Sequence, residues 1–148
     1  MTYRHSAAPL VRTLALAALL AVSGTAFAAG DLTLKPTELK PLKLGLGDAG
    51  YGVSEKTYNL ETGKAYSLEI SSTGKKECAW QAPAFFQSIF LRKVEVEEVE
   101  IKAIGLTEIE MEQEGEAELF FVPLKPGTYP WFCKGMDERG MKGEFVVK

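Results

Sequence analysis

The sequence predicts an all-β fold, a sandwich of about seven to eight short strands. From residue 65 to the C-terminus, short segments in which apolar and polar residues alternate are separated by turn signals rich in Gly, Pro, Ser and Lys. The clearest pair of strands covers residues 117–124 and 128–133, which the turn Lys125-Pro126-Gly127 joins as a hairpin. These two observations favour a sandwich over any helical fold.

The N-terminal half supplies the first expected strands. Residues 31–52 are rich in Lys, Leu, Pro and Gly, and we expect them to form a leader segment that either packs on the sandwich or stays loose. A strand is predicted over residues 65–70, after the turn at 62–64, and a second short strand over residues 77–81. Residues 82–88 are predicted to be an irregular apolar connection between strands.

The later strands carry many glutamates. Over residues 94–101, Val and Ile alternate with acidic residues, and the slip at Glu97-Glu98 predicts a bulge within one strand. Residues 108–112 alternate glutamates with Ile109 and Met111, which is typical of a strand whose acidic face is solvated. Residues 145–147 are expected to end the sheet. We therefore interpret the glutamates as a surface feature and not as a cation site.

The first 28 residues have the pattern of a secretory signal peptide. Arg4 and Arg12 precede a short apolar run at residues 14–22, and Ala26-Phe27-Ala28 has the pattern of a small-residue cleavage site. The run is short for a membrane span, so an uncleaved anchor is the less favoured alternative. The expected organisation is a signal peptide at 1–28, a leader at 29–52 and one domain at 53–148, in a protein exported to the periplasm with no transmembrane segment after cleavage.

Removal of the signal changes the charge and the inventory of ligands. Of the 17 Lys and Arg residues, Arg4 and Arg12 lie in the signal, which leaves 15 basic against 20 acidic residues and argues against nucleic acid as a partner. His5 is the only histidine, so the exported chain has none. Without an imidazole to activate a nucleophile, we expect a protein that is not an enzyme.

The C-terminal part resembles a known family. Gly127-Thr128-Tyr129, Phe132-Cys133, Met141-Lys142-Gly143 and Val146-Val147 carry the resemblance. Over residues 63–148 the chain is similar to the cupredoxins, which include plastocyanin-like and azurin-like blue-copper proteins. The resemblance implies a Greek-key β-sandwich and a copper ion at one end of it.

The same resemblance implies a set of metal ligands. Cupredoxins hold copper with a His from an early strand end and with Cys, His and Met from the terminal loop. By position, Cys133 corresponds to the Cys and Met141 to the Met, whereas Met136 takes the place of the loop His. Glu77, or Cys78 one position further, takes the place of the early His. Because soft sulfur ligands select Cu(I), Cys133, Met136 and Met141 imply a Cu(I) site in a divergent family member, with Cys78 or the harder oxygen of Glu77 as a fourth donor.

Three functions remain open at this point. The first is a periplasmic protein that holds Cu(I) and exchanges it with a copper donor or acceptor protein. The second is an electron carrier with an atypical copper centre and a redox partner. The third is a metal-free scaffold that acts by protein–protein contact. A Cys78–Cys133 disulfide is a further alternative, because an exported protein meets an oxidising compartment and a disulfide would remove the thiolate.

Overall fold

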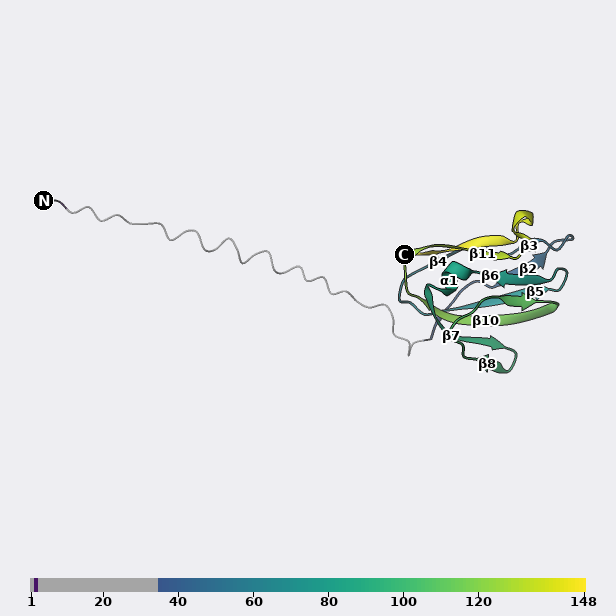
Figure 1. Cartoon of the computed structure of the whole chain (residues 1–148), viewed down its shortest axis with the longest axis horizontal. Coiled ribbons are helices and arrows are strands. Elements are labelled where there is room, and N and C mark those ends of the chain that lie inside the picture. The colour runs from purple at the N-terminus through teal and green to yellow at the C-terminus, as the bar shows by residue number, and fades with distance from the viewer. Residues whose placement is uncertain (1, 3–34) are drawn as a thin grey trace.

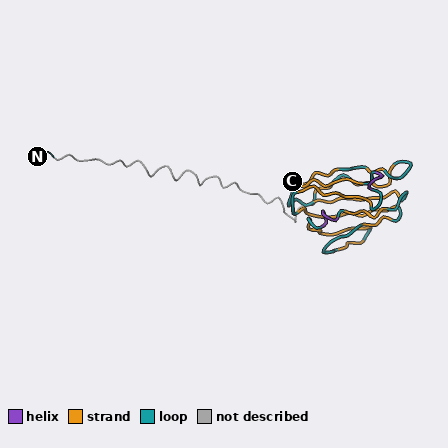
Figure 2. The backbone as a smooth tube through the Cα atoms, turned by 45° about the horizontal axis from the view of Figure 1, so that its top comes forward, coloured by secondary structure: helices purple, strands orange, loops and turns teal. Residues whose placement is uncertain are grey.

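The computed structural model describes Thr2 and residues 35–148. The predicted signal peptide and the start of the predicted leader therefore lie outside the described residues, apart from Thr2. The described part is nearly all β, with two packed sheets, as predicted (Figure 1, Figure 2). Twelve strands are described, and eight of them are four residues or longer.

Each sheet has a simple order of strands. The first sheet runs β3 (Gly52–Val53), β2 (Leu42–Leu46), β5 (Tyr66–Thr73), β10 (Glu114–Pro123), β7 (Ile89–Val96) and β8 (Val99–Ile101), with β1 (Thr37–Glu38) also paired to β5. The second sheet runs β4 (Thr57–Leu60), β12 (Lys142–Val147), β11 (Gly127–Cys133), β6 (Cys78–Gln81) and β9 (Ile109–Met111). β8 and β9 therefore each form one outer edge of their sheet.

The core lies between the two sheets and is rich in aromatic rings. Phe85 and Phe145 stack with their ring centroids 4.0 Å apart, and Phe121 meets Phe85 edge-on at 5.3 Å. All three rings are at most 1% exposed. Such pairs add about 0.5–1.5 kcal/mol each beyond the burial of their surface. The central aromatic cluster thus fixes how the sheets face each other.

The chain enters the sandwich before residue 53, so the segment expected to be a leader packs on the domain. β2 pairs in parallel with β5, with Leu42 opposite Ile70, and Leu42 and Leu44 are fully buried. β1 pairs with β5 as well. Pro41 and the nearby glycines had suggested a leader, but the apolar residues of this segment pack against a strand far along the chain.

Residues 94–101 do not form one bulged strand. They form the hairpin β7–β8, in which Val96 pairs with Val99 and Glu97-Glu98 is the turn. Glu97 has φ of 51°, a left-handed conformation that costs a non-glycine residue about 1–2 kcal/mol. A bulge exists elsewhere, where the pairing of β7 with β10 slips and leaves Arg92 as the extra residue.

The predicted irregular connection contains one helical turn. α1 (Pro83–Phe86) begins with Pro at its first position, where the missing N–H costs nothing. Its Phe85 and Phe86 are buried, whereas Phe90, four residues further on, is half-exposed. Among the described residues, no helix is long and apolar enough to cross a membrane.

Candidate functional site

The two cysteines meet where two neighbouring strands of the second sheet come together. Cys78 is the first residue of β6 and Cys133 is the last residue of β11, and Cys133 lies opposite Trp80 in the antiparallel pairing. Cys78 and Cys133 form a disulfide with their Cα atoms 5.1 Å apart, within the usual range for such bonds. Both residues are at most 1% exposed. The bond therefore lies in the core and ties β6 to the end of β11.

A compact loop follows Cys133 and returns the chain to it. The N–H of Met136 donates to the carbonyl of Cys133 at 2.9 Å, and the N–H of Cys133 donates to the carbonyl of Met141, also at 2.9 Å. Between them, the 3₁₀ turn Asp137–Arg139 ends at Gly140, whose φ of 98° favours glycine. These bonds bring the backbones of Cys133, Met136 and Met141 together, as a loop that binds metal requires.

The five predicted ligands do not share one environment. Met141 is fully buried, and Met136 is partly buried and packs against the core. Glu77 is exposed, one residue outside β6. Cys78 and Cys133 are consumed by the disulfide. The loop therefore brings the backbones of Met136 and Met141 to Cys133, whereas Glu77 is exposed.

One sulfur residue near the disulfide was missed as a site candidate. Met111 on β9 lies directly opposite Cys78 in the antiparallel register and is 7% exposed. Residues opposite each other in such a pair project from the same face of the sheet. The alternation of residues 108–112 had already placed Met111 on the inner face, so the missing information was which strand pairs with β6.

The tryptophans beside the disulfide belong to the core. Trp80 and Trp131 are fully buried with their ring centroids 6.4 Å apart, and neither indole N–H has a hydrogen-bond partner among the described residues. Gly143 allows Trp131 to lie here, since a Cβ on Gly143 would come within 2.5 Å of the indole ring. Trp131 therefore fills space between strands, as a packing residue does.

The donor chemistry in the oxidised chain does not fit copper. A cupredoxin centre needs a thiolate and two imidazoles with a weak axial thioether. In the described residues both cysteine sulfurs are bonded to each other, and no cluster of three or more His, Cys, Asp or Glu side chains could hold a metal ion. The sulfur donors left in the terminal loop are the thioethers of Met136 and Met141.

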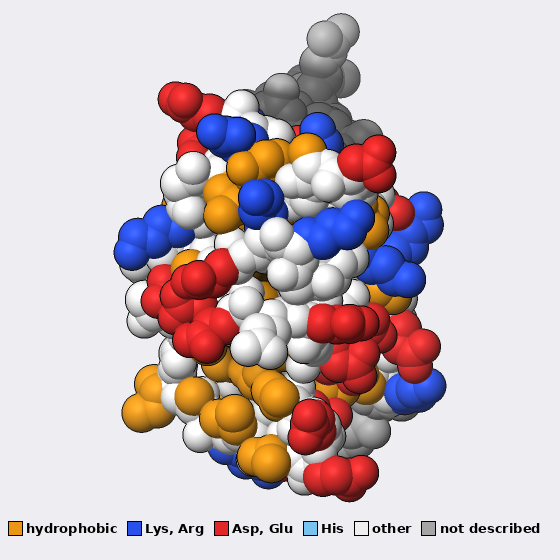
Figure 3. Space-filling view, turned by 90° about the vertical axis from the view of Figure 1, so that its right-hand side faces the viewer, with side chains coloured by type: hydrophobic (Ala, Val, Ile, Leu, Met, Phe, Trp, Pro, Cys, Tyr) orange, Lys and Arg blue, Asp and Glu red, His pale blue; other side chains and the backbone are white. Residues whose placement is uncertain are grey.

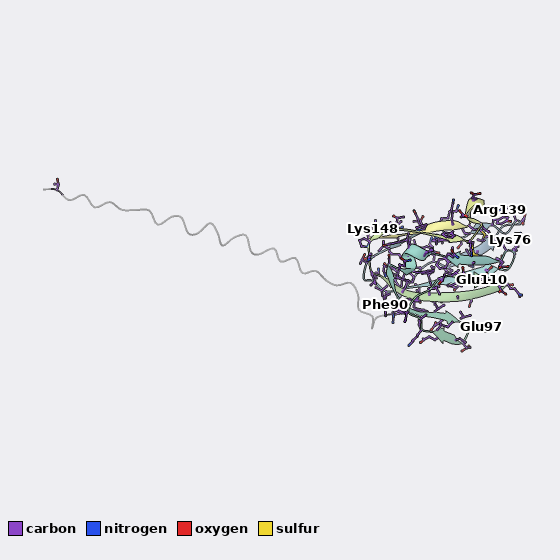
Figure 4. All side chains as sticks on the ribbon, in the orientation of Figure 1. Lys76, Phe90, Glu97, Glu110, Arg139 and Lys148 are labelled. Atoms are coloured by element: carbon purple, nitrogen blue, oxygen red, sulfur yellow. A yellow bond between two sulfur atoms is a disulfide. The ribbon has the colours of Figure 1, made fainter. Side chains whose placement is uncertain are left out.

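Two basic side chains lie against one aromatic ring near the terminal loop. The ammonium of Lys76 lies 5.2 Å from the centroid of the Tyr51 ring, and the guanidinium of Arg139 lies 4.8 Å from the same centroid. Figure 4 shows both labelled side chains at one end of the sandwich, away from Lys148 at the C-terminus. One aromatic ring therefore holds two positive charges at this end.

The two packed sheets form a cupredoxin-like β-sandwich, which confirms the fold that the resemblance implied. Solved structures agree with it at the level of the fold. The chain is similar to a copper-containing nitrite reductase from Thermus scotoductus (TM-score 0.61, 10% identity, covering 79% of this chain and 32% of that one). It is also similar to a laccase from Pediococcus acidilactici (TM-score 0.59, 8% identity, 82% and 28%) and to a multicopper oxidase from Campylobacter jejuni (TM-score 0.54, 12% identity, 78% and 31%).

These likenesses concern the fold alone. The chain spans about a third of the length of the nitrite reductase and the oxidases. No family model matches the sequence, and no curated protein matches it. The particular activity of this chain is therefore argued from its own residues.

Proposed function

We propose that this protein is an exported, non-enzymatic cupredoxin-like module in which a disulfide replaces the metal and which acts through contacts with other proteins. The observation that supports the proposal is the buried Cys78–Cys133 bond. In copper-binding cupredoxins the metal joins an early strand end to the terminal loop. Here the disulfide makes that connection, so the sandwich is held closed at this end without copper.

The Cys78–Cys133 disulfide also stabilises the folded chain. It closes a loop over a sequence separation of 55 residues, for which chain entropy gives a stabilisation of about 4 kcal/mol. A disulfide that closes so long a loop in so small a domain contributes a large share of the total stability of about 5–15 kcal/mol. Export to the periplasm, which the signal-like N-terminus suggests, would supply the conditions in which it forms.

The test is the response of the exported protein to copper. Thermal unfolding is measured with no addition, with Cu(II), with Cu(I) under anaerobic conditions, and with a copper chelator. A ligand that binds only the folded state must raise the unfolding temperature, so an unchanged midpoint in all four conditions is expected. A midpoint that rises with copper and falls with chelator would contradict the proposal.

A second function is favoured by one observation, namely that the backbone of the buried Met141 is hydrogen-bonded to the disulfide residue Cys133, at 2.9 Å from its N–H to the Met141 carbonyl. A two-electron reduction by an external dithiol would convert the disulfide to the Cys78 and Cys133 thiols, in the same part of the fold as the Met141 thioether. Thiolate and thioether are donors that select Cu(I). In its reduced form the chain would then hold Cu(I) for a donor or acceptor protein. Electron transfer is less favoured, because this donor set lacks the imidazoles that support Cu(II).

This second function is tested separately from the first. The reduced chain is titrated anaerobically with Cu(I) against a competing chelator, with the oxidised chain as the control. One Cu(I) per reduced chain, none per oxidised chain, and loss of binding in Cys133→Ser would support it. Failure of the reduced chain to compete with the chelator would remove the Cu(I) function and leave the metal-free proposal intact.

A further inference from the structure

The outer edge of the first sheet has no partner strand among the described residues. β8 is the last strand in the order of that sheet, and its three residues, Val99–Ile101, are all exposed. An edge strand presents unpaired N–H and C=O groups that can pair with another chain. This edge belongs to the sheet that does not carry the disulfide, so pairing here does not depend on the disulfide.

The inner face of the β7–β8 hairpin is apolar and uncovered. The register pairs Val94 with Ile101 and Val96 with Val99, so these side chains share the face that points toward the second sheet. Val94 is 5% exposed, but Val96, Val99 and Ile101 are 37%, 59% and 46% exposed. The apolar face of the hairpin thus extends beyond the area that the second sheet covers.

The apolar surface continues beyond the hairpin. Ile104, in the segment that leads from β8 to β9, is fully exposed, and it lines two shallow grooves with Ile89. Figure 3 shows hydrophobic side chains gathered at the lower end of the molecule, on the side where Figure 1 places β8. Single exposed apolar residues are ordinary, but a contiguous group at a sheet edge indicates an interaction surface.

We propose that a second copy of this chain pairs with this edge, β8 against β8, antiparallel about a two-fold axis at Glu100. Complete overlap of the two strands sets Val99 of each copy opposite Ile101 of the other. Opposite residues in an antiparallel pair project from the same face, so the two uncovered apolar faces become one. The contact is isologous and closes as a dimer.

The charges that flank β8 are complementary in this pairing. Glu98 precedes the strand and Lys102 follows it, so each Glu98 lies opposite Lys102 of the second copy, on the outer face of the joined sheet. The two Glu100 carboxylates meet at the axis. Each of them already contacts two lysines of its own chain, Lys93 at 2.9 Å and Lys102 at 3.1 Å, which offset the repulsion.

The other sheet offers an edge strand that serves as an internal comparison. β9 is flanked by Glu108 and Glu112 and has Glu110 at its centre. The same two-fold pairing there would set Glu108 opposite Glu112 twice, with no lysine in the segment. Like charges placed directly opposite are unfavourable. Of the two edges, β8 is therefore the one whose sequence accepts its own copy.

The first test uses charge exchange. Sedimentation of the exported protein over a range of concentrations is expected to show a monomer–dimer equilibrium. In Lys102→Glu the dissociation constant should rise about tenfold or more, because two attractive pairs become repulsive. Adding Glu98→Lys to that variant should restore most of the lost affinity between the two copies. A native chain that stays monomeric at millimolar concentration, or a dimer indifferent to Lys102→Glu, would overturn the proposal.

The second test probes the register itself. Glu100→Cys places one thiol on the proposed axis, where it can bond only to the same residue of the second copy. Mild oxidation should convert this variant to a covalent dimer, while the matched variant Glu110→Cys on β9 stays largely monomeric. Circular dichroism confirms that each variant is folded. Equal cross-linking of the two variants, or none of Glu100→Cys, would overturn the β8 pairing.

Discussion

Close packing around Gly143 leaves no room for a side chain larger than a hydrogen atom. A Cβ at this position would lie 2.1 Å from the carbonyl oxygen of Lys56 and 2.5 Å from the Trp131 ring. Neither can move freely, because one is backbone and the other is a fully buried indole. The residue is therefore required by close approach and not by backbone conformation.

We expect Gly143→Ala to lower the free energy of unfolding by about 2–3 kcal/mol, since overpacking a filled core costs this much. Gly115→Ala is the matched control. Gly115 lies in β10 with no atom within 4 Å of its added Cβ, so alanine there should leave stability unchanged or raise it by about 0.5 kcal/mol. Chemical denaturation measures both. A Gly143→Ala variant with the same free energy of unfolding as the native chain would contradict the packing described for Trp131.

The disulfide gives a second prediction at the scale of single residues. Replacing both cysteines, Cys78→Ala with Cys133→Ala, should lower the free energy of unfolding by about 2–4 kcal/mol through loss of the cross-link. Met141→Leu keeps the volume of a buried side chain and should cost less than about 1.5 kcal/mol. Denaturant titration without reductant compares the two. If Met141→Leu were the more damaging change, the thioether would have a role beyond packing.

At the scale of elements, the first sheet carries a row of glutamates across four strands. Glu118 on β10 lies opposite Glu69 on β5 and also opposite Glu95 on β7, and Glu95 lies opposite Glu100 on β8. Lys93 contacts both Glu95 and Glu100. The β7–β8 end of the row is therefore compensated by a lysine, while Glu118 faces a like charge on each side.

Glu118→Gln should accordingly raise the free energy of unfolding by about 0.5 kcal/mol, because it removes like charges from two cross-strand pairs. The gain should shrink in high salt, which screens partly exposed charges. Glu112→Gln, an exposed residue outside the row, is the control. Thermal unfolding at low and high salt measures both variants. A loss of stability in Glu118→Gln would mean that the attraction between Glu118 and Lys35 outweighs the two like-charge pairs.

The lysine-compensated end gives a pH dependence. Hydrogen bonds from Lys93 and then from Lys102 lower the pKa of Glu100 below its ordinary value of 4.5. A lowered folded pKa means that the stabilisation is complete above pH 4.5 and is lost as the pH falls through the folded value. The native chain and Glu100→Gln should therefore converge in stability in acid. The midpoints of urea unfolding of both proteins, measured between pH 7 and pH 3, test this convergence. A difference in midpoint that stays constant over this pH range would contradict the prediction.

At the scale of the whole molecule, local patterns predicted the strands that fold by local rules. β10 and β11 were predicted as strands because Lys125-Pro126-Gly127 is a strong turn signal, and β5 and β6 because turns precede them. The predicted pairing of β10 with β11 as a hairpin is wrong, since β10 pairs with β5 and β7 in the first sheet and β11 pairs with β12 and β6 in the second. β2 was missed, since its burial depends on parallel pairing with β5, which no local pattern reveals. The β7–β8 turn was missed because Glu97-Glu98 contains none of the residues that usually mark such turns.

The site was predicted only in part for the same reason. The terminal loop gathers Cys133, Met136 and Met141 as the resemblance implied, and the Cys78–Cys133 bond was one of two open alternatives. A choice between a thiolate and a disulfide depends on the meeting of two strands 55 residues apart. Met111 was not seen as a neighbour of Cys78, because sequence gives the face of β9 but not the strand beside it.

The proposed replacement of the metal by the disulfide is tested best by a count of free thiols and bound copper in the protein purified without reductant. The protein is unfolded in denaturant without reductant, and the thiols are titrated while metal is measured on the same sample. We expect no free thiol, two after reduction, and no copper. Two free thiols with one copper per chain would show that the metal has been kept.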